Sequence, residues 1–141
     1  MKYTILSAFL LATATLLPSS LLAATPSAAD AEVYFVTPKD GETVPETFKV
    51  VFGLKGMDVS PAGNNQPNSG HHHLLIDVDS LADFSLPLPA NDNVRHFGGG
   101  QTETMMTLPK GKHTLQLLLG DYLHIPHHKP VISEKITITV Q

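Results

Sequence analysis

The chain has 141 residues, the length of one domain. It contains no cysteine, which excludes disulfide scaffolds, thiol catalysis, cysteine-ligated zinc and iron–sulfur clusters. The formal net charge is −4 and lysine and arginine form no run, so a counterion-releasing contact with nucleic acid has no electrostatic basis. The distinctive residue is histidine, which occurs eight times in a chain whose single arginine is Arg95.

The N-terminal residues are typical of a secretory signal peptide. A positive start at Met1-Lys2 precedes an apolar stretch that ends in small residues at Ala24. Because Pro18 and two serines interrupt this stretch, the apolar run is shorter than the ~20 residues that crossing a bilayer requires. We therefore expect residues 1–24 to be a signal peptide.

Removal of this leader predicts an exported protein. We expect cleavage after Ala23, Ala24 or Ala31, and a flexible mature N-terminus over residues 25–32. No cysteine follows the apolar stretch, so anchoring through a lipidated cysteine is excluded, and no membrane span is predicted in the mature form. The predicted location is the periplasm or the exterior. Without disulfides, the domain must be stabilised by a hydrophobic core.

The mature part alternates apolar and polar residues with a period close to two, and no window shows a helical stripe. Phe48, Val50 and Phe52, for example, share one face of a strand. Turn-forming residues divide the pattern into seven short strands, over residues 33–36, 48–54, 71–78, 93–97, 103–108, 113–119 and 132–140. This pattern predicts an all-β domain over residues 33–141, folded as a seven-stranded antiparallel immunoglobulin-like β-sandwich.

The predicted topology gathers most of the histidines. In an antiparallel sandwich the chain reverses at each strand, so alternate connections emerge at the same end. The strands over 71–78 and 113–119 are neighbours in this fold, which brings the start of one beside the end of the other. The sequence therefore predicts one cluster at one end of the domain, made of His71, His73, His96, His124, His127 and His128.

The spacing within this cluster suits a metal ion. His71 and His73 are two apart on a strand, so their side chains share a face with Cα atoms ~6.6 Å apart. His72 points to the opposite face, where we expect a hydrogen-bonded core histidine. Neutral imidazole is a common ligand of zinc and copper, and the affinity of nitrogen-rich sites rises toward copper(II). The predicted cofactor is a copper or zinc ion.

The remaining motifs are weaker. Met57 belongs to the same end and could add a thioether ligand for copper(I), although packing in the core is the favoured interpretation. His113 is expected at a corner of the sandwich, bonded to the backbone. Neither a Gly-x-Ser-x-Gly elbow nor a His-Glu-x-x-His pair occurs, so we expect that the protein is not an enzyme.

Four blocks carry a resemblance to a known family: PKDGETVP at 38–45, GHHHLLID at 70–77, HFGGGQTE at 96–103 and LPKGKHTLQL at 108–117. Together they resemble an uncharacterised bacterial family of small exported proteins, a domain of unknown function. The resemblance covers about residues 33–140 and implies export and one compact domain, but no activity. More loosely, the chain is similar to periplasmic copper-carrying proteins of the copper-resistance type, although it lacks their mature N-terminal histidine.

Two functional hypotheses follow. The first is a periplasmic or secreted monomer that binds copper or zinc through some of the six clustered histidines. The second is a non-catalytic module whose partner is a cell-envelope protein or peptide, with the same histidines as hydrogen-bonding contacts. Protein purified without an affinity tag distinguishes them by its metal content and its co-purifying partners.

Overall fold

The structure is a computed structural model that describes residues 24–81 and 83–141. Apart from Ala24, the predicted signal peptide lies outside the described residues. Within these ranges the chain forms only strands: β1 (Glu32–Thr37), β2 (Thr43–Val44), β3 (Thr47–Lys55), β4 (Asp58–Val59), β5 (Ser69–Ile76), β6 (Val94–His96), β7 (Glu103–Thr107), β8 (Gly111–Gly120) and β9 (Ile136–Val140). Over the same ranges, no helix long and apolar enough for a membrane span is found.

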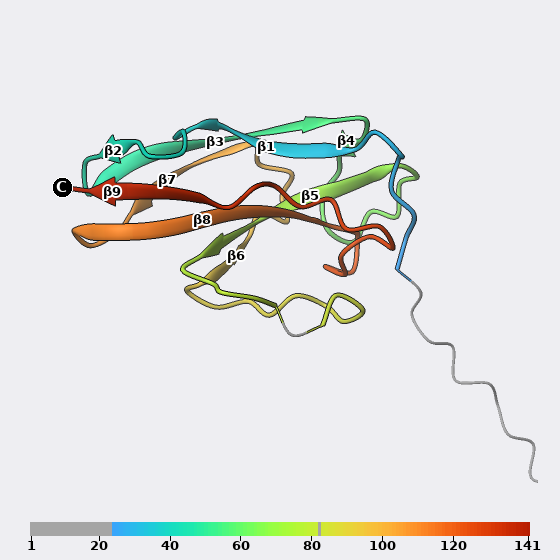
Figure 1. Cartoon of the computed structure of the whole chain (residues 1–141). Coiled ribbons are helices and arrows are strands. Elements are labelled where there is room, and N and C mark those ends of the chain that lie inside the picture. The colour runs from blue at the N-terminus through green and yellow to red at the C-terminus, as the bar shows by residue number, and fades with distance from the viewer. Residues whose placement is uncertain (1–23, 82) are drawn as a thin grey trace, which may run out of the picture.

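The strands form two sheets that pack face to face (Figure 1). One sheet has the order β1-β3-β7, and the other has the order β2-β9-β8-β5-β4, with β6 also paired to β5. The first, second and fifth predicted strands thus share one sheet, while the third, sixth and seventh share the other. This arrangement confirms the predicted all-β, immunoglobulin-like sandwich.

The strand count and the pairing differ from the prediction in two respects. Two additional strands, β2 and β4, have two residues each, too few for an alternating pattern to reveal them. Both pair in parallel, β2 with β9 and β4 with β5, so the sandwich is not entirely antiparallel.

The last strand is also shorter than predicted. It begins at Ile136 instead of Ile132. The amide of Leu117 donates to the hydroxyl of Ser133, 2.9 Å away, instead of to a backbone carbonyl. A side chain thus takes the place of a ladder partner, and the regular pairing with β8 starts only after it.

The core lies between the two sheets. Val50 of β3, Leu74 of β5, Leu115 and Leu117 of β8 and Ile138 of β9 are completely buried there. The alternation of the strands brings these apolar side chains to the inner faces, as the period of two predicts. Burial of such side chains is the main stabilising contribution in a domain without disulfides.

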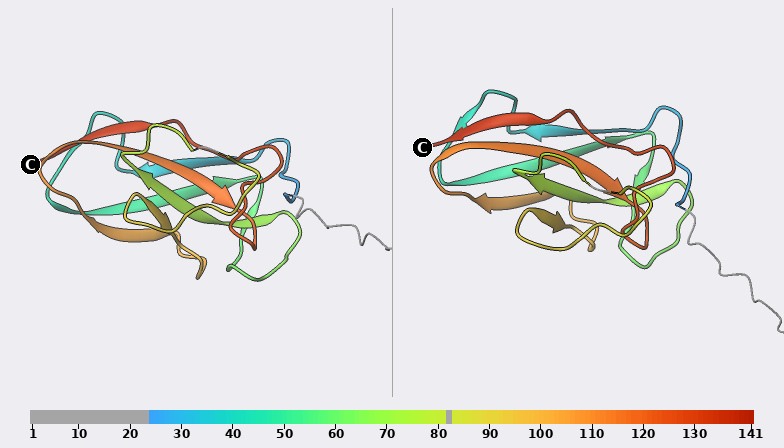
Figure 2. Two further views of the ribbon diagram at one scale, coloured as in Figure 1. Left: turned by 90° about the horizontal axis from the view of Figure 1, so that it is seen from below. Right: turned by 60° about the horizontal axis from the view of Figure 1, so that its bottom comes forward.

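The outer face of the six-stranded sheet is covered as well. Leu75 and Leu118 face outward and pack with Leu88, which belongs to the segment after β5, and with Val94 of β6. The described part of this segment, residues 77–81 and 83–93, runs across β5 and β8, as the view from below shows (Figure 2). As a result all eight residues of β5 are buried, on both faces of the strand.

The residues before β1 lie against the connection between β8 and β9. The carbonyl of Thr25 accepts from the amide of His128 at 2.9 Å, and the hydroxyl of Ser27 donates to the carbonyl of Lys129 at 2.8 Å. The ammonium group of Lys129 donates to the carbonyl of Ala29 at 2.9 Å. The stretch 25–32, which we expected to be flexible, thus makes specific contacts with the domain, and its last residue begins β1.

Candidate metal centre

Three histidine side chains converge on the outer face of the six-stranded sheet. His71 and His73 project from β5, and His124 lies in the turn after β8. One ring nitrogen from each of the three residues lies within 4.8 Å of the others. We call this group the histidine centre. The structure thereby brings together residues that are some fifty positions apart, as the predicted topology required.

The distances within the histidine centre suit a shared metal ion. Nδ1 of His124 is 2.9 Å from Nε2 of His71 and 3.3 Å from Nε2 of His73. Ligand nitrogens that bind one tetrahedral zinc ion at ~2.0–2.1 Å lie about 3.3–3.4 Å apart. A small adjustment of the rings would therefore place all three nitrogens around one ion.

Not every ring nitrogen of the histidine centre has a hydrogen-bond partner among the described residues. If Nε2 of His71 and of His73 both donate to Nδ1 of His124, the two Nδ1 atoms of the donor rings carry lone pairs, and neither has a partner among the described residues. Both rings are completely buried. A metal ion bound by Nε2 of both rings and by Nδ1 of His124 would use the lone pairs of those three atoms and release the protons that they share.

A glycine makes room for one of the rings. Gly120, the last residue of β8, is the Cα partner of His71 in the sheet. A Cβ atom at position 120 would collide with the ring of His73. Gly120 therefore allows the imidazole of His73 to lie directly over the end of β8.

His124 sits on strained backbone. Its φ is 65°, a left-handed conformation that few residues other than glycine adopt. Such strain persists only where the surroundings hold it, and it is concentrated at functional sites. Here the turn between Asp121 and Ile125 holds it, through hydrogen bonds that involve the side chain of Asp121.

A fourth ring adjoins the histidine centre. His96 of β6 is the register partner of His73, and its ring centroid is 4.4 Å from that of His73 and 4.7 Å from that of His124. Nε2 of His96 donates to the carbonyl of Pro89 at 2.8 Å. This bond leaves Nδ1 of His96 with a free lone pair, the arrangement that metal-ligating histidines commonly show.

The environment keeps the rings neutral. Burial, reinforced by the neighbouring rings of His124 and His96, lowers the pKa of His71 to about 4. Burial and the surrounding histidines lower the pKa of His73 to about 2. The pKa of His124 is lowered by burial and by His96, against the opposing charge of Asp121. Neutral imidazole is the form that binds metal ions.

The two other predicted ligands lie outside the histidine centre. His127 is buried, and its Nδ1 is 2.9 Å from the hydroxyl of Thr25. Its Nε2 has no partner among the described residues. His128 is exposed, with its amide bonded to Thr25. Both follow Pro126, which forms an isolated bridge with Gly120, and Nε2 of His127 lies against Gly70 of β5.

The remaining singled-out residues are structural. His72 faces the core, as predicted, and its ring lies 5.0 Å from that of Phe52, but neither of its nitrogens has the expected partner among the described residues. Met57 packs in the core. His113 donates from Nε2 to the carbonyl of Pro109 at 2.8 Å, which confirms the predicted corner contact, and its Nδ1 binds the carboxylate of Asp77.

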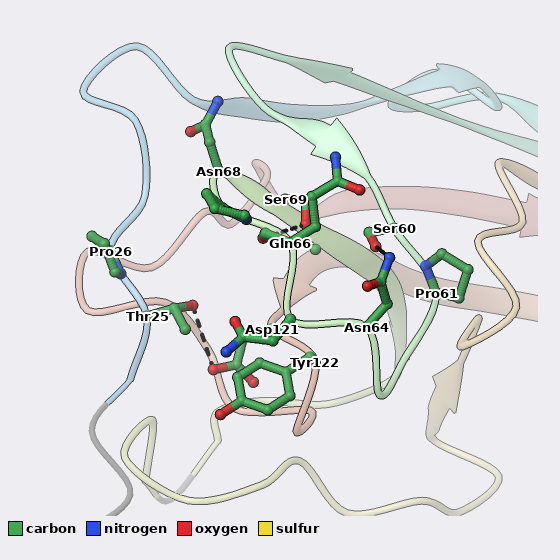
Figure 3. Close-up of a pocket in the computed structure, with 13 residues that line it drawn as sticks. Thr25, Pro26, Ser60, Pro61, Asn64, Gln66, Asn68, Ser69, Asp121 and Tyr122 are labelled. Carbon is green, nitrogen blue, oxygen red and sulfur yellow. Dashed lines mark hydrogen bonds between the residues drawn. The ribbon is translucent and has the colours of Figure 1, made fainter.

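A cavity of about 180 Å³ is lined by residues that precede the ligands of the histidine centre in the sequence (Figure 3). Ser69 and Gly70 at the start of β5 come before His71, and Asp121 and Tyr122 lie in the turn that carries His124. Sequence reasoning missed Asp121, although a Gly-Asp dipeptide at the end of an apolar strand is a recognisable turn signal. It missed Gly120 and Pro89 too, because only their spatial neighbours give them a role.

The chain shows similarity to one family and to two solved structures. Residues 50–141 match the family described as Domain of unknown function (DUF4399). No curated protein matches the chain.

The first similar structure is the endo-β-1,4-mannanase from Thermotoga petrophila, at 18% identity and a TM-score of 0.47 over 79% of this chain and 20% of that one. The second is a structure of the fibronectin(III)-like modules of Clostridium thermocellum CbhA, at 12% identity and a TM-score of 0.35 over 77% and 92%. The chain thus spans only 20% of the mannanase. Since the family match covers well over half of the chain and includes every histidine described above, the chain belongs to the DUF4399 family.

Proposed function

We propose that this protein is a non-catalytic binding protein for a divalent transition-metal ion. The ion is bound by His71, His73 and His124. The observation that carries this proposal is the convergence of three imidazole nitrogens, two of them from completely buried rings, within 4.8 Å of one another. Among the described residues this is the one group of three or more histidine, aspartate or glutamate side chains with such spacing.

The donor atoms favour copper(II) or zinc. All three ligands are neutral nitrogen donors, which suit zinc, copper and nickel, and the general order of affinities places copper(II) above zinc. The thioether of Met57 packs in the core and is not part of the centre, so a copper(I) site of mixed sulfur and nitrogen ligands has no support. We expect one ion per chain, with copper(II) bound more tightly than zinc.

His96 lies outside the group of three with mutual distances within 4.8 Å, and in this proposal its ring moves toward the ion to add a fourth ligand. Its Nδ1 carries a lone pair because Nε2 donates to the carbonyl of Pro89, and its ring lies beside two of the other three. Zinc in closed sites takes four ligands with tetrahedral geometry. A site of four imidazoles would hold the ion firmly and leave no open position for chemistry, which agrees with a binding role.

The predicted signal peptide supports a location in the periplasm or outside the cell. An exported protein meets copper and zinc directly, without the reducing thiols of the cytoplasm. Because the chain has no cysteine, its affinity for these metals depends on histidine. A small exported carrier or buffer for copper(II) or zinc is therefore the function that we propose.

The test is calorimetric titration of the exported, tag-free protein, after removal of metal, with copper(II) and zinc. We expect one high-affinity site. Nitrogen hyperfine structure in the electron paramagnetic resonance spectrum of the copper form would report imidazole ligation. The double variant His71→Ala/His73→Ala is expected to lose the site, and the single variant His124→Ala is expected to weaken it by at least tenfold.

The matched control is His72→Leu, which removes the histidine between the two ligands on the opposite face of β5. It should bind both metals as the unaltered protein does, and circular dichroism should show that all variants fold. Micromolar or weaker binding that is unchanged in the double variant would end the proposal. If the metal-free protein instead co-purifies with one stoichiometric partner, the interaction module is favoured.

A further inference from the structure

Asp121 closes the turn that carries His124. The residue follows β8 directly, and its Oδ1 accepts from the amide of Leu123 at 2.8 Å and from the amide of Ile125 at 3.0 Å. Its backbone takes part too, because its amide donates to the carbonyl of Ile125 at 2.8 Å and its carbonyl accepts from the amide of His124 at 2.9 Å. Four hydrogen bonds from one residue thus fix a five-residue turn.

This turn determines where the ring of His124 lies. His124 stands between the two residues whose amides Asp121 holds, and its φ of 65° is a conformation that an unconstrained histidine rarely adopts. Ile125 is buried, which anchors the far side of the turn in the domain. Without the carboxylate, Leu123 and Ile125 would lose their acceptor and the backbone of His124 could relax. Nδ1 of His124 would then move away from His71 and His73.

The second oxygen of Asp121 faces the cavity that Asp121 helps to line. Oδ2 is 3.4 Å from the hydroxyl of Thr25 (Figure 3), and this hydroxyl also lies 2.9 Å from Nδ1 of His127. Asp121 is only 2% exposed, and no lysine or arginine forms an ion pair with it among the described residues. Its charge acts on the nearby rings, since it opposes the lowering of the pKa of His71 and His124 that burial causes.

Such a charge favours a cation at the histidine centre. Three or four neutral imidazoles leave the full charge of a divalent ion in a buried site, and buried charges require compensation. A carboxylate that is itself held by backbone amides supplies this compensation without binding the ion. Carboxylates and carbonyls that orient ligands in this way are a general feature of metal sites.

We propose that Asp121 is the positioning residue of the histidine centre. Its Oδ1 holds the turn that aims His124 at His71 and His73, and its negative charge offsets that of the bound ion. This inference rests on the proposed function, since it assigns a role toward the same ion. It concerns a residue that the sequence patterns did not single out.

The test compares Asp121→Ala with Asp121→Asn in calorimetric titrations with copper(II) and with zinc. Alanine removes both the acceptor and the charge, so we expect a 10- to 100-fold loss of affinity, roughly the range for residues that orient metal ligands. Asparagine keeps an oxygen that can accept from Leu123 and Ile125 but removes the charge. We expect it to recover part of the affinity, with an intermediate dissociation constant.

A measurement without metal separates the geometric role from general stability. Ring ¹⁵N chemical shifts of His71, His73 and His124 in the metal-free protein should be preserved in Asp121→Asn and changed in Asp121→Ala. Asp77→Ala is the matched control, because Asp77 also accepts a backbone amide and contacts a histidine, but at a different site. It should lower stability and leave the metal affinity unchanged.

The outcomes distinguish this inference from the proposed function. If the unaltered protein binds neither metal, the proposed function fails, although the ring shifts still test the turn. If it binds metal and Asp121→Ala binds within twofold of it with unchanged ring shifts, the role of Asp121 is overturned. If Asp121→Ala does not fold, Asp121→Asn decides, because an affinity equal to that of the unaltered protein would overturn the charge effect, and ring shifts that change although the acceptor oxygen is kept would overturn the assigned turn.

Discussion

Gly120 shows how one missing side chain determines the position of a ligand. Any Cβ atom at this position would collide with the imidazole of His73. We predict that Gly120→Ala forces this ring out of the histidine centre, lowers the free energy of unfolding by about 1–3 kcal/mol, as overpacking does, and weakens metal binding by about tenfold or more. Urea denaturation and calorimetric titration measure the two effects.

A double-mutant cycle identifies the cause. If the collision with His73 is responsible, Gly120→Ala should cost much less stability in a protein that already carries His73→Ala. An equal loss in both backgrounds would mean that the substitution disturbs the strand end itself, and it would contradict the assigned contact.

Part of the histidine centre could be predicted from the sequence. The alternation of β5 separates His71 and His73 from His72, and this part of the prediction holds because it depends only on the local geometry of a strand. Whether His96, His127 or His128 joins them depends on register and turn geometry. His96 reaches the group because β6 pairs with β5 opposite His73.

At the scale of elements, an ion pair connects the end of β5 with the start of β8. Nδ1 of His113 is 2.7 Å from the carboxylate of Asp77, which also accepts the amide of Thr114 at 2.8 Å. Partial burial lowers the pKa of His113, but the bonds to Asp77 and Pro109 and the charge of Asp77 outweigh it, so the pKa is raised. The charged form of His113 is therefore favoured by the fold.

The sign of the resulting pH dependence follows from linkage. A raised pKa in the folded state contributes stability that is fully present below the unfolded pKa of 6.5 and is lost as the pH rises through the folded value. We predict that Asp77→Asn destabilises the protein below pH 6.5, by less than about 1 kcal/mol because the pair is partly exposed. This difference should shrink at higher pH.

Urea denaturation between pH 5 and pH 9 measures this difference. Asp79→Asn is the control, because Asp79 is a nearby carboxylate without a contact to His113. A difference between the unaltered protein and Asp77→Asn that grows with pH would contradict the assignment.

Elements with a long alternating pattern were predictable, and the short ones were not. The strands that correspond to β3, β5 and β8 were predicted near their observed bounds because they carry many alternating residues. β2 and β4 have two residues each and are held by parallel pairing, β2 with the distant β9 and β4 with β5 across a loop, which an alternating pattern does not encode. The late start of β9 reflects a side-chain hydroxyl that replaces a backbone acceptor.

At the scale of the whole molecule, the residues before β1 stabilise the connection that carries His124. Thr25 and Ser27 bond to it, and Ala28 and Ala31 pack against the core. We predict that a chain beginning at Glu32 is less stable than one beginning at Thr25, by about 2 kcal/mol for the lost hydrogen bonds and packing. It should also bind metal more weakly.

Denaturation in urea and metal titration of the two forms provide the measurement, and the mass of the exported protein shows which form occurs naturally. Cleavage after Ala23 or Ala24 keeps this segment, whereas cleavage after Ala31 removes it. Equal stability and equal affinity of the two forms would show that the segment is dispensable.

The sequence by itself determined that the domain is built of strands, which histidines lie on one face of β5, and that stability must come from a core. These properties depend on the composition of the chain and on the alternation of apolar and polar residues along each strand, and neither requires contacts between distant residues. Only the tertiary structure decided that His124 and His96 join His71 and His73 while His127 turns toward Thr25. Cross-strand register, the turn held by Asp121 and the space left by Gly120 determine that outcome, and each depends on contacts between residues far apart in the chain.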